Sequence, residues 1–516
     1  MTSSLVIDAL GRVLIEPRCT QRWHRLMAIW ERTADAAERQ SVLDRLTADL
    51  ASDPLANILR LTFLARTTGN PDYESEAARR TLDLVPEDAD RLAACLAFRW
   101  LSALQDLDGR EAFIAALNSG SAPELARRLA LAASAFRPAG LQPRAADDIR
   151  RVAMVVPYVG HRFHTPSMMA VEQCRVLVRE GLQVRIFSAQ ELAPPDAGLF
   201  RGDGRDLKLP PLDARGWSGL LPSGVNMTIA DTRYGLTGRW GNLLATIADF
   251  DPDAVMLLGL YSPLAAALHA VRPTAGISVN SVPPLAPLDV WLAASSETGA
   301  GDIWNGAFAR PLQIEHPFRV RRRTDVQPLS RAQLGIALDA TVWITAGFRL
   351  EHEIRGEWAA RILELLAKHP NAVWLIVGGE GIIPPALAGA PGGRARALPT
   401  RDDLPAILRC CDVYVNPPRM GGGFSVAEAM AEGLPVSSLC GSDGGDKVGD
   451  LAFADLGSYL RGLDELTANK SARAAMGAAL QRRFRERFDL ENSGRSLMAA
   501  LREAARLADQ RFSRPS

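Results

Sequence analysis

The sequence predicts an α/β protein in which two Rossmann-like domains follow an all-α, repeat-like domain. A chain of 516 residues is too long for one hydrophobic core, so two to four domains are expected. After residue 145, short apolar runs alternate with helical patterns, whereas strand patterns are almost missing before it. Alternation of this kind is typical of parallel sheets that carry helices on both faces.

Composition and charge narrow the class of protein. With 47% apolar and 23% charged residues, the chain has the composition of a globular protein. Its 59 basic and 59 acidic side chains balance, which argues against a nucleic-acid binder. The cysteines show no CxxC spacing and the N-terminus lacks a signal-peptide pattern, so we expect a cytoplasmic protein. The most apolar window, 254–271, contains glycine, proline and histidine and does not predict a transmembrane segment, although peripheral membrane contact stays open.

Residues 1–145 are predicted to form the helical domain. Leu43, Leu46 and Leu50 recur at helical spacing, and proline and glycine breakers separate segments of helix-hairpin length. The stretch 69–88 resembles the second helix of a tetratricopeptide repeat, but uneven proline spacing does not establish a regular array.

Residues 146–327 are predicted to form the first Rossmann-like domain. A buried strand at 151–157 leads through a loop to a helix, for which Thr165 is the expected N-cap and Pro166 the first helical residue. A strand at 183–187 completes a β-α-β unit. Further short strands are expected at 254–258, 277–280 and 290–293.

Residues 328–471 are predicted to form the second Rossmann-like domain, and 472–516 a charged helical segment. Four strands alternate here with helical segments and are expected at 341–345, 372–377, 412–416 and 435–439. Because ligand sites of such sheets lie beyond the carboxyl ends of the strands, a cleft between the two domains is expected to hold the site.

The most informative segment is 416–436, in which a glycine-rich turn follows a strand and opens directly into a helix. Glycines allow a ligand to approach the backbone closely, and the free N–H groups of a helix start favour an anion. A diphosphate is therefore expected against Gly422, Gly423, Phe424 and Ser425.

This segment resembles the donor-binding half of GT-B glycosyltransferases, especially the group 1 family, in which a glycine-rich turn precedes Glu-Ala-Met-Ala-x-Gly-Leu-Pro-Val. The resemblance implies that Glu428 accepts hydrogen bonds from the ribose hydroxyls of the donor. The family pattern has a sugar-contacting glutamate eight positions earlier, where this chain has Met420. An alternative for Glu428 is structural, because Ser425-x-x-Glu428 also fits a helix capping box.

The same resemblance extends to other parts of the donor domain. It implies that Arg349 contacts phosphate and that Leu398 lies where the nucleobase is held by main-chain contacts. The segment 441–449, with Asp446 and Lys447, resembles the loop that closes over the donor. The alternatives are a surface position for Arg349 and a solvated loop charge for Lys447.

The loop 160–166 lies at the carboxyl edge of the first domain and contains His161 and His164. Imidazole titrates near neutral pH, so either histidine could act as a general base or contact the donor phosphate. Surface hydrogen bonding is the alternative. This loop and the helical domain are also similar to bacterial cytosolic protein glucosyltransferases that act on adhesins.

No Asp-x-Asp pair lies where it could hold a metal-bound donor, because 251–253 precedes its strand. We therefore expect a metal-independent hexosyltransferase with no cofactor besides its co-substrate. It would move sugar from a nucleotide diphosphate sugar, preferably a UDP-sugar, to a saccharide, lipid or protein. A nucleotide-sugar epimerase of the same fold and a non-catalytic helical-repeat adaptor are the alternatives.

Overall fold

The structure is a computed structural model of the chain. It describes residues 2–15, 20–48, 54–83, 89–106, 109–136, 140–145, 148–160, 162, 164–192, 214–217, 219–277, 279, 282–294 and 303–513. The chain forms two compact units. Unit 1 contains Met1–Leu101, Ile114–Glu315 and Ser496–Ser516, and unit 2 contains Ser102–Phe113 and His316–Arg495.

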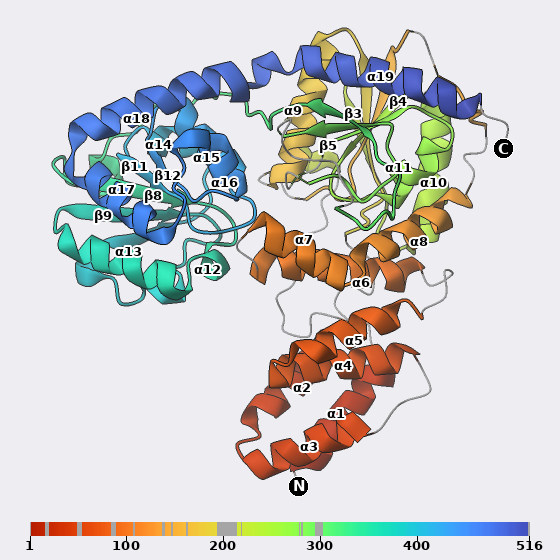
Figure 1. Cartoon of the computed structure of the whole chain (residues 1–516), viewed down its shortest axis with the longest axis horizontal. Helices are drawn as coiled ribbons and strands as arrows, with labels where there is room; N and C mark the ends of the chain where they lie inside the picture. Colours follow the sequence, from red (N-terminus) through yellow and green to blue (C-terminus); the bar gives the residue numbers. More distant parts are fainter. Residues whose placement is uncertain are drawn as a thin grey trace. The chain divides into compact units, whose positions relative to one another are not determined.

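Helices occupy the described part of the N-terminal region, as the sequence predicts (Figure 1). They are α1 (Thr2–Ile15), α2 (Thr20–Arg32), α3 (Ala36–Ala48), α4 (Pro54–Thr68), α5 (Pro71–Thr81), α6 (Ala89–Asp106), α7 (Arg110–Ser119) and α8 (Ala122–Ser134).

Contacts within unit 1 tie α6 and α8 to its Rossmann-like part. The Asp90 carboxylate accepts a hydrogen bond from Leu236 N at 2.9 Å. The rings of Trp100 and Tyr261 pack edge to face with centroids 6.3 Å apart. Helix α8 packs along α11 (Pro263–His269).

Unit 1 contains a parallel sheet in the order β3-β2-β1-β4-β5-β6-β7. Its strands are β1 (Arg151–Val155), β2 (Gln183–Ser188), β3 (Asn226–Ile229), β4 (Ala254–Leu258), β5 (Thr274–Ile277), β6 (Val290–Ala293) and β7 (Leu312–Glu315). The connecting helices besides α11 are α9 (Thr165–Arg179) and α10 (Leu236–Phe250). The central strands β1 and β4 are almost fully buried, as parallel strands covered on both faces must be.

Unit 2 contains the second parallel sheet, in the order β10-β9-β8-β11-β12. Its strands are β8 (Thr341–Ala346), β9 (Ala372–Val377), β10 (Ala395–Leu398), β11 (Val413–Val415) and β12 (Val436–Ser437). Its helices are α12 (Leu350–Glu353), α13 (Gly356–Lys368), α14 (Leu404–Leu408), α15 (Gly423–Ala431), α16 (Asp443–Val448), α17 (Leu456–Ala468) and α18 (Lys470–Arg483). The C-terminal helix α19 (Gly494–Phe512) lies mostly in unit 1.

Alternation along β8 assigns the two faces of the unit 2 sheet. Val342 and Ile344 belong to a core shared with α15 and α18, whereas Trp343 belongs to one shared with α13 and α17. Successive side chains of a strand point to opposite faces, so each face of the sheet carries its own helical layer (Figure 1).

Three local expectations are wrong. The N-cap of α9 is His164, and Thr165 is already helical. The strand expected at 277–280 is β5, which ends at Ile277; residues 278, 280 and 281 lie outside the described residues. The segment 441–449 is not a loop throughout, because α16 occupies Asp443–Val448. Among the described helices, none combines the length and apolarity needed to cross a membrane.

Candidate functional site

The glycine-rich turn of unit 2 lies between β11 and α15. Gly421 and Gly422 have φ values of +100° and +77°, a left-handed backbone that favours glycine, and Gly422 is the N-cap of α15. As a glycine, this N-cap has no side chain that could make the usual capping hydrogen bond. The first N–H groups of α15 are therefore placed for an external acceptor such as a phosphate oxygen.

The capping box that was the structural alternative for Ser425 and Glu428 is not formed. Ser425 lies inside α15, and its hydroxyl donates to Gly422 O at 3.1 Å and Ala346 O at 3.2 Å. The Tyr414 hydroxyl in turn donates to Ser425 Oγ at 2.8 Å. The helix starts earlier than the box requires because Gly422 adopts the left-handed conformation.

Glu428 has a different structural partner, which the sequence did not indicate. Its Oε1 accepts a hydrogen bond from Arg323 Nη2 at 3.1 Å, and Arg323 Nη1 also donates to Asp402 O at 2.9 Å. Burial raises the pKa of Glu428, and the Arg323 guanidinium partly opposes the rise. The side chain is 10% exposed, so Glu428 is almost buried within unit 2.

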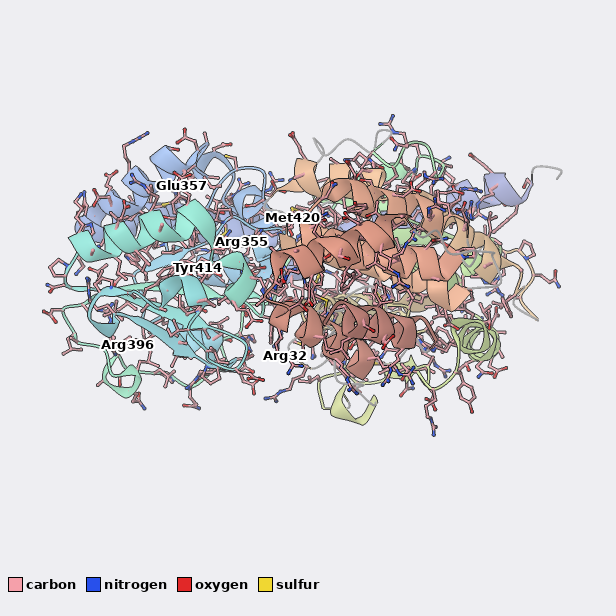
Figure 2. All side chains as sticks on the ribbon, turned by 90° about the horizontal axis from the view of Figure 1, so that it is seen from below. Arg32, Arg355, Glu357, Arg396, Tyr414 and Met420 are labelled. Carbon is pink, nitrogen blue, oxygen red and sulfur yellow. The ribbon has the colours of Figure 1, made fainter. Side chains whose placement is uncertain are left out.

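Arg349 is held between the turn and two other groups. Its Nη2 donates to Met420 O at 2.8 Å and lies 2.9 Å from Glu353 Oε1, while Nη1 donates to Leu104 O at 3.2 Å. The side chain remains 26% exposed. Met420 is fully buried, so its side chain offers no contact to a sugar; Figure 2 marks it together with Tyr414.

Leu398 is the last residue of β10, and its carbonyl accepts a hydrogen bond from Gly378 N at 2.9 Å. Its side chain packs against the core that includes α15. Because β10 is parallel to β9, β8 and β11, the chain leaves β10 at the same edge of the sheet as it leaves β8 and β11.

Asp446 and Lys447 lie on α16, and neither is a solvated loop charge. Asp446 forms an ion pair with Arg110. Lys447 Nζ donates to Phe318 O at 2.8 Å and lies 4.6 Å and 4.7 Å from the ring centroids of Phe318 and Phe488. Burial lowers the pKa of Lys447 to about 7, although Asp443 and Asp446 favour its charged form.

His164 is in unit 1, beyond the carboxyl end of β1. Its Nδ1 is 2.6 Å from Ser167 Oγ, which also accepts a hydrogen bond from Gly160 N at 2.9 Å. The rings of His164 and Tyr158 pack edge to face with centroids 5.4 Å apart. Ser167 is buried, so its hydroxyl holds the imidazole ring in one orientation. His161 lies outside the described residues.

The structure therefore brings most of the expected donor residues together around the start of α15, within unit 2. His164 belongs to unit 1. Sequence reasoning missed Arg323, Arg419, Glu353 and Ser167. Ser167 could have been predicted, because a serine three residues after a histidine at a helix start is close enough to contact the imidazole ring.

Comparisons with known proteins identify the class. Residues 341–448 match the family described as glycosyl transferases group 1. No curated protein has a matching sequence. Among solved structures, an O-GlcNAc transferase of Thermobaculum terrenum superposes with a TM-score of 0.53 at 15% identity, covering 99% of both chains.

Two further solved structures are similar at lower TM-scores. The HepE protein of Anabaena, solved with UDP-glucose, has a TM-score of 0.49 at 13% identity, covering 68% of this chain and 99% of its own. Sucrose-phosphate synthase of Thermosynechococcus elongatus has a TM-score of 0.48 at 13% identity, covering 70% and 99%.

Two parallel-sheet units, one with a glycine turn before a helix, have the GT-B fold. The segment 341–448, which runs from β8 to α16, is similar to the group 1 glycosyl transferases. On this match the chain is a glycosyltransferase.

Proposed function

We propose that the enzyme transfers a hexosyl group from a UDP-sugar to a hydroxyl or amide of a saccharide, lipid or protein, without a metal ion. One observation carries the proposal: the segment that matches the group 1 family forms a helix start with glycine as its N-cap and a buried glutamate on the same helix. These are the two features that a nucleoside diphosphate needs, an anion site and an acceptor for ribose hydroxyls.

In this proposal the donor binds along the carboxyl edge of the unit 2 sheet. The diphosphate lies against the backbone of Gly422, Gly423, Phe424 and Ser425. Arg349 supplies a guanidinium at the same turn, because a quarter of its side chain is exposed there. The ribose hydroxyls bind Glu428, and the base binds the main chain at Leu398. Asp446 and Lys447 support the turn from α16.

The chemistry is a substitution at the anomeric carbon. The acceptor oxygen or nitrogen forms a bond to that carbon as the bond to the UDP oxygen breaks. The acceptor proton passes to His164 or His161 as general base. Negative charge that develops on the leaving diphosphate is stabilised by the start of α15 and Arg349, so the electrostatic contribution comes from groups already in place.

A panel of nucleotide diphosphates tests the donor assignment. We expect UDP at a hundred times its Kd to stabilise the protein by about 3 kcal/mol and to raise Tm by several degrees. ADP, GDP and CDP at the same concentration should give smaller shifts. A larger Tm shift with one of them would assign its base to the donor in place of uracil. The absence of a Tm shift with all four nucleotides would contradict the donor site. Release of labelled sugar from the preferred nucleotide sugar provides the activity readout.

The N-terminal helices are proposed to recognise the acceptor, since stacked helical hairpins offer an extended surface for a polymer. Deleting residues 1–83 removes α1 to α5 but keeps the Asp90 and Trp100 contacts of α6 with the rest of unit 1. We expect UDP affinity and donor hydrolysis within about twofold of wild type and loss of transfer to the native acceptor. Full transfer by the shortened chain would contradict this role. A deletion of 1–145 is the comparison, and we expect it to aggregate because it exposes the α11 surface.

A further inference from the structure

A buried arginine lies directly under the glycine-rich turn of unit 2. Arg419 is 2% exposed and has hydrogen bonds on all three guanidinium nitrogens. Nη1 donates to Glu353 Oε2 at 2.7 Å, Nη2 to Ala346 O at 3.2 Å, and both Nε and Nη2 to Asn416 Oδ1 at 3.1 Å and 2.9 Å. The guanidinium is therefore fixed in one orientation.

Glu353 is shared between two arginines. Its Oε2 pairs with Arg419 and its Oε1 with Arg349. Burial alone would raise the pKa of Glu353, but Arg419 and Arg349 outweigh it and hold the pKa below its ordinary value. The Arg349–Glu353–Arg419 cluster thus contains two positive charges and one negative charge, and its net charge is positive.

The cluster is pressed against the backbone of the turn. A Cβ atom added to Gly422 would lie 2.3 Å from Arg419 Nε, and one added to Gly421 would lie 2.9 Å from Arg349 Nη2. Gly347, at the end of β8, has the same relation to Arg419, with 2.6 Å to Nη1. Glycine at these three positions lets the two guanidinium groups approach the turn from below.

Two acidic residues of α16 also interact with cations near the turn. Asp443 lies next to Gly423 and favours the charged form of Lys447, and Asp446 pairs with Arg110. The cluster itself keeps its net positive charge at the start of α15, where the helix dipole has the same sign.

We propose that Arg419 is a positioning residue for the donor diphosphate: with Glu353 and Arg349 it forms a buried cationic support that fixes the turn and attracts the phosphates without contacting them. This inference rests on the proposed function, because it concerns the same subsite. A buried charge is weakly screened, so it acts across the thickness of the turn. Arg419 directly precedes the buried Met420, which replaces the acidic residue of the family pattern.

The test is the affinity ratio between UDP and uridine, because only UDP carries the phosphates. Calorimetry with uridine, UMP and UDP gives this ratio for the wild-type protein and for three variants. Arg419→Met removes the excess charge and should lower the ratio about tenfold. Arg419→Lys keeps the charge and should keep the ratio within about threefold. Glu353→Gln removes the only negative charge and should raise the ratio, although it also weakens the packing.

Opposite signs for Arg419→Met and Glu353→Gln separate an electrostatic role from a structural one, because both changes destabilise the fold. Arg331→Met is the matched control. Arg331 binds the Asp412 carboxylate at 2.8 Å and three backbone carbonyls at the amino end of the same sheet. It should lower Tm and leave the ratio unchanged. If Arg419→Met does not fold, Glu353→Gln and Arg419→Lys decide the question.

A ratio that falls in both Arg419→Met and Glu353→Gln, or that changes in neither, overturns the inference while leaving the donor site in place. Absence of UDP binding to the wild-type protein has a different meaning. It contradicts the proposed function itself, and the inference is then overturned with it.

Discussion

Glu428→Gln is expected to weaken UDP binding about 30-fold. A carboxylate accepts hydrogen bonds from two ribose hydroxyls more strongly than an amide does, by about 1 kcal/mol for each bond. The fold should change little, because glutamine keeps the volume and can still accept from Arg323. Removing a carboxylate whose pKa is raised by burial also removes a desolvation cost. Calorimetry with UDP measures the affinity, and thermal unfolding measures stability.

Glu432→Gln is the control for that prediction. Glu432 follows α15 directly, has a side chain 6% exposed and binds an arginine, Arg409, at 2.9 Å. It therefore matches Glu428 in type, burial and partner, but it lies one turn further from the start of α15. We expect unchanged UDP affinity for this variant. Equal affinities of the Glu428→Gln variant and the wild type would leave Glu428 as a structural partner of Arg323 alone.

The central strands were predictable from the sequence because their apolar runs are unbroken. The strands at 254–258, 290–293 and 372–377 are found at the expected residues. Strands β3, β7 and β10 were missed. Every residue of β3 and β7, and every residue of β10 except Ala395, is exposed or half-buried. Among the described strands these three are edge strands, with a neighbour on one side and a weak apolar pattern.

The glycine turn and its helix were predictable because glycine spacing reports backbone geometry directly. The ion pairs around them were not. Arg323 and Glu428 are 105 residues apart in sequence, and Arg419 and Glu353 are 66 apart. Neither pair produces a periodic pattern in the sequence, because its two residues come together only once the sheet has formed. The hydrogen bonds of Ser425 were unpredictable for a related reason, because its partners Tyr414 and Ala346 come from neighbouring strands.

His164→Gln is expected to lower kcat for transfer by about a hundredfold to ten-thousandfold and to leave UDP affinity unchanged. If the imidazole accepts the acceptor proton, Nδ1–H must donate to Ser167 Oγ, which leaves Nε2 as the basic atom. Glutamine keeps a hydrogen-bond donor but cannot accept a proton, so the His164→Gln variant should be as inactive as His164→Ala.

Ser167→Ala removes the group that orients the ring and should lower kcat less, by about tenfold. His161→Gln, measured in parallel, shows which histidine acts as the base. Near-normal kcat in His164→Gln together with a loss in His164→Ala would instead make His164 a donor to the phosphate, and the proton would then need another acceptor.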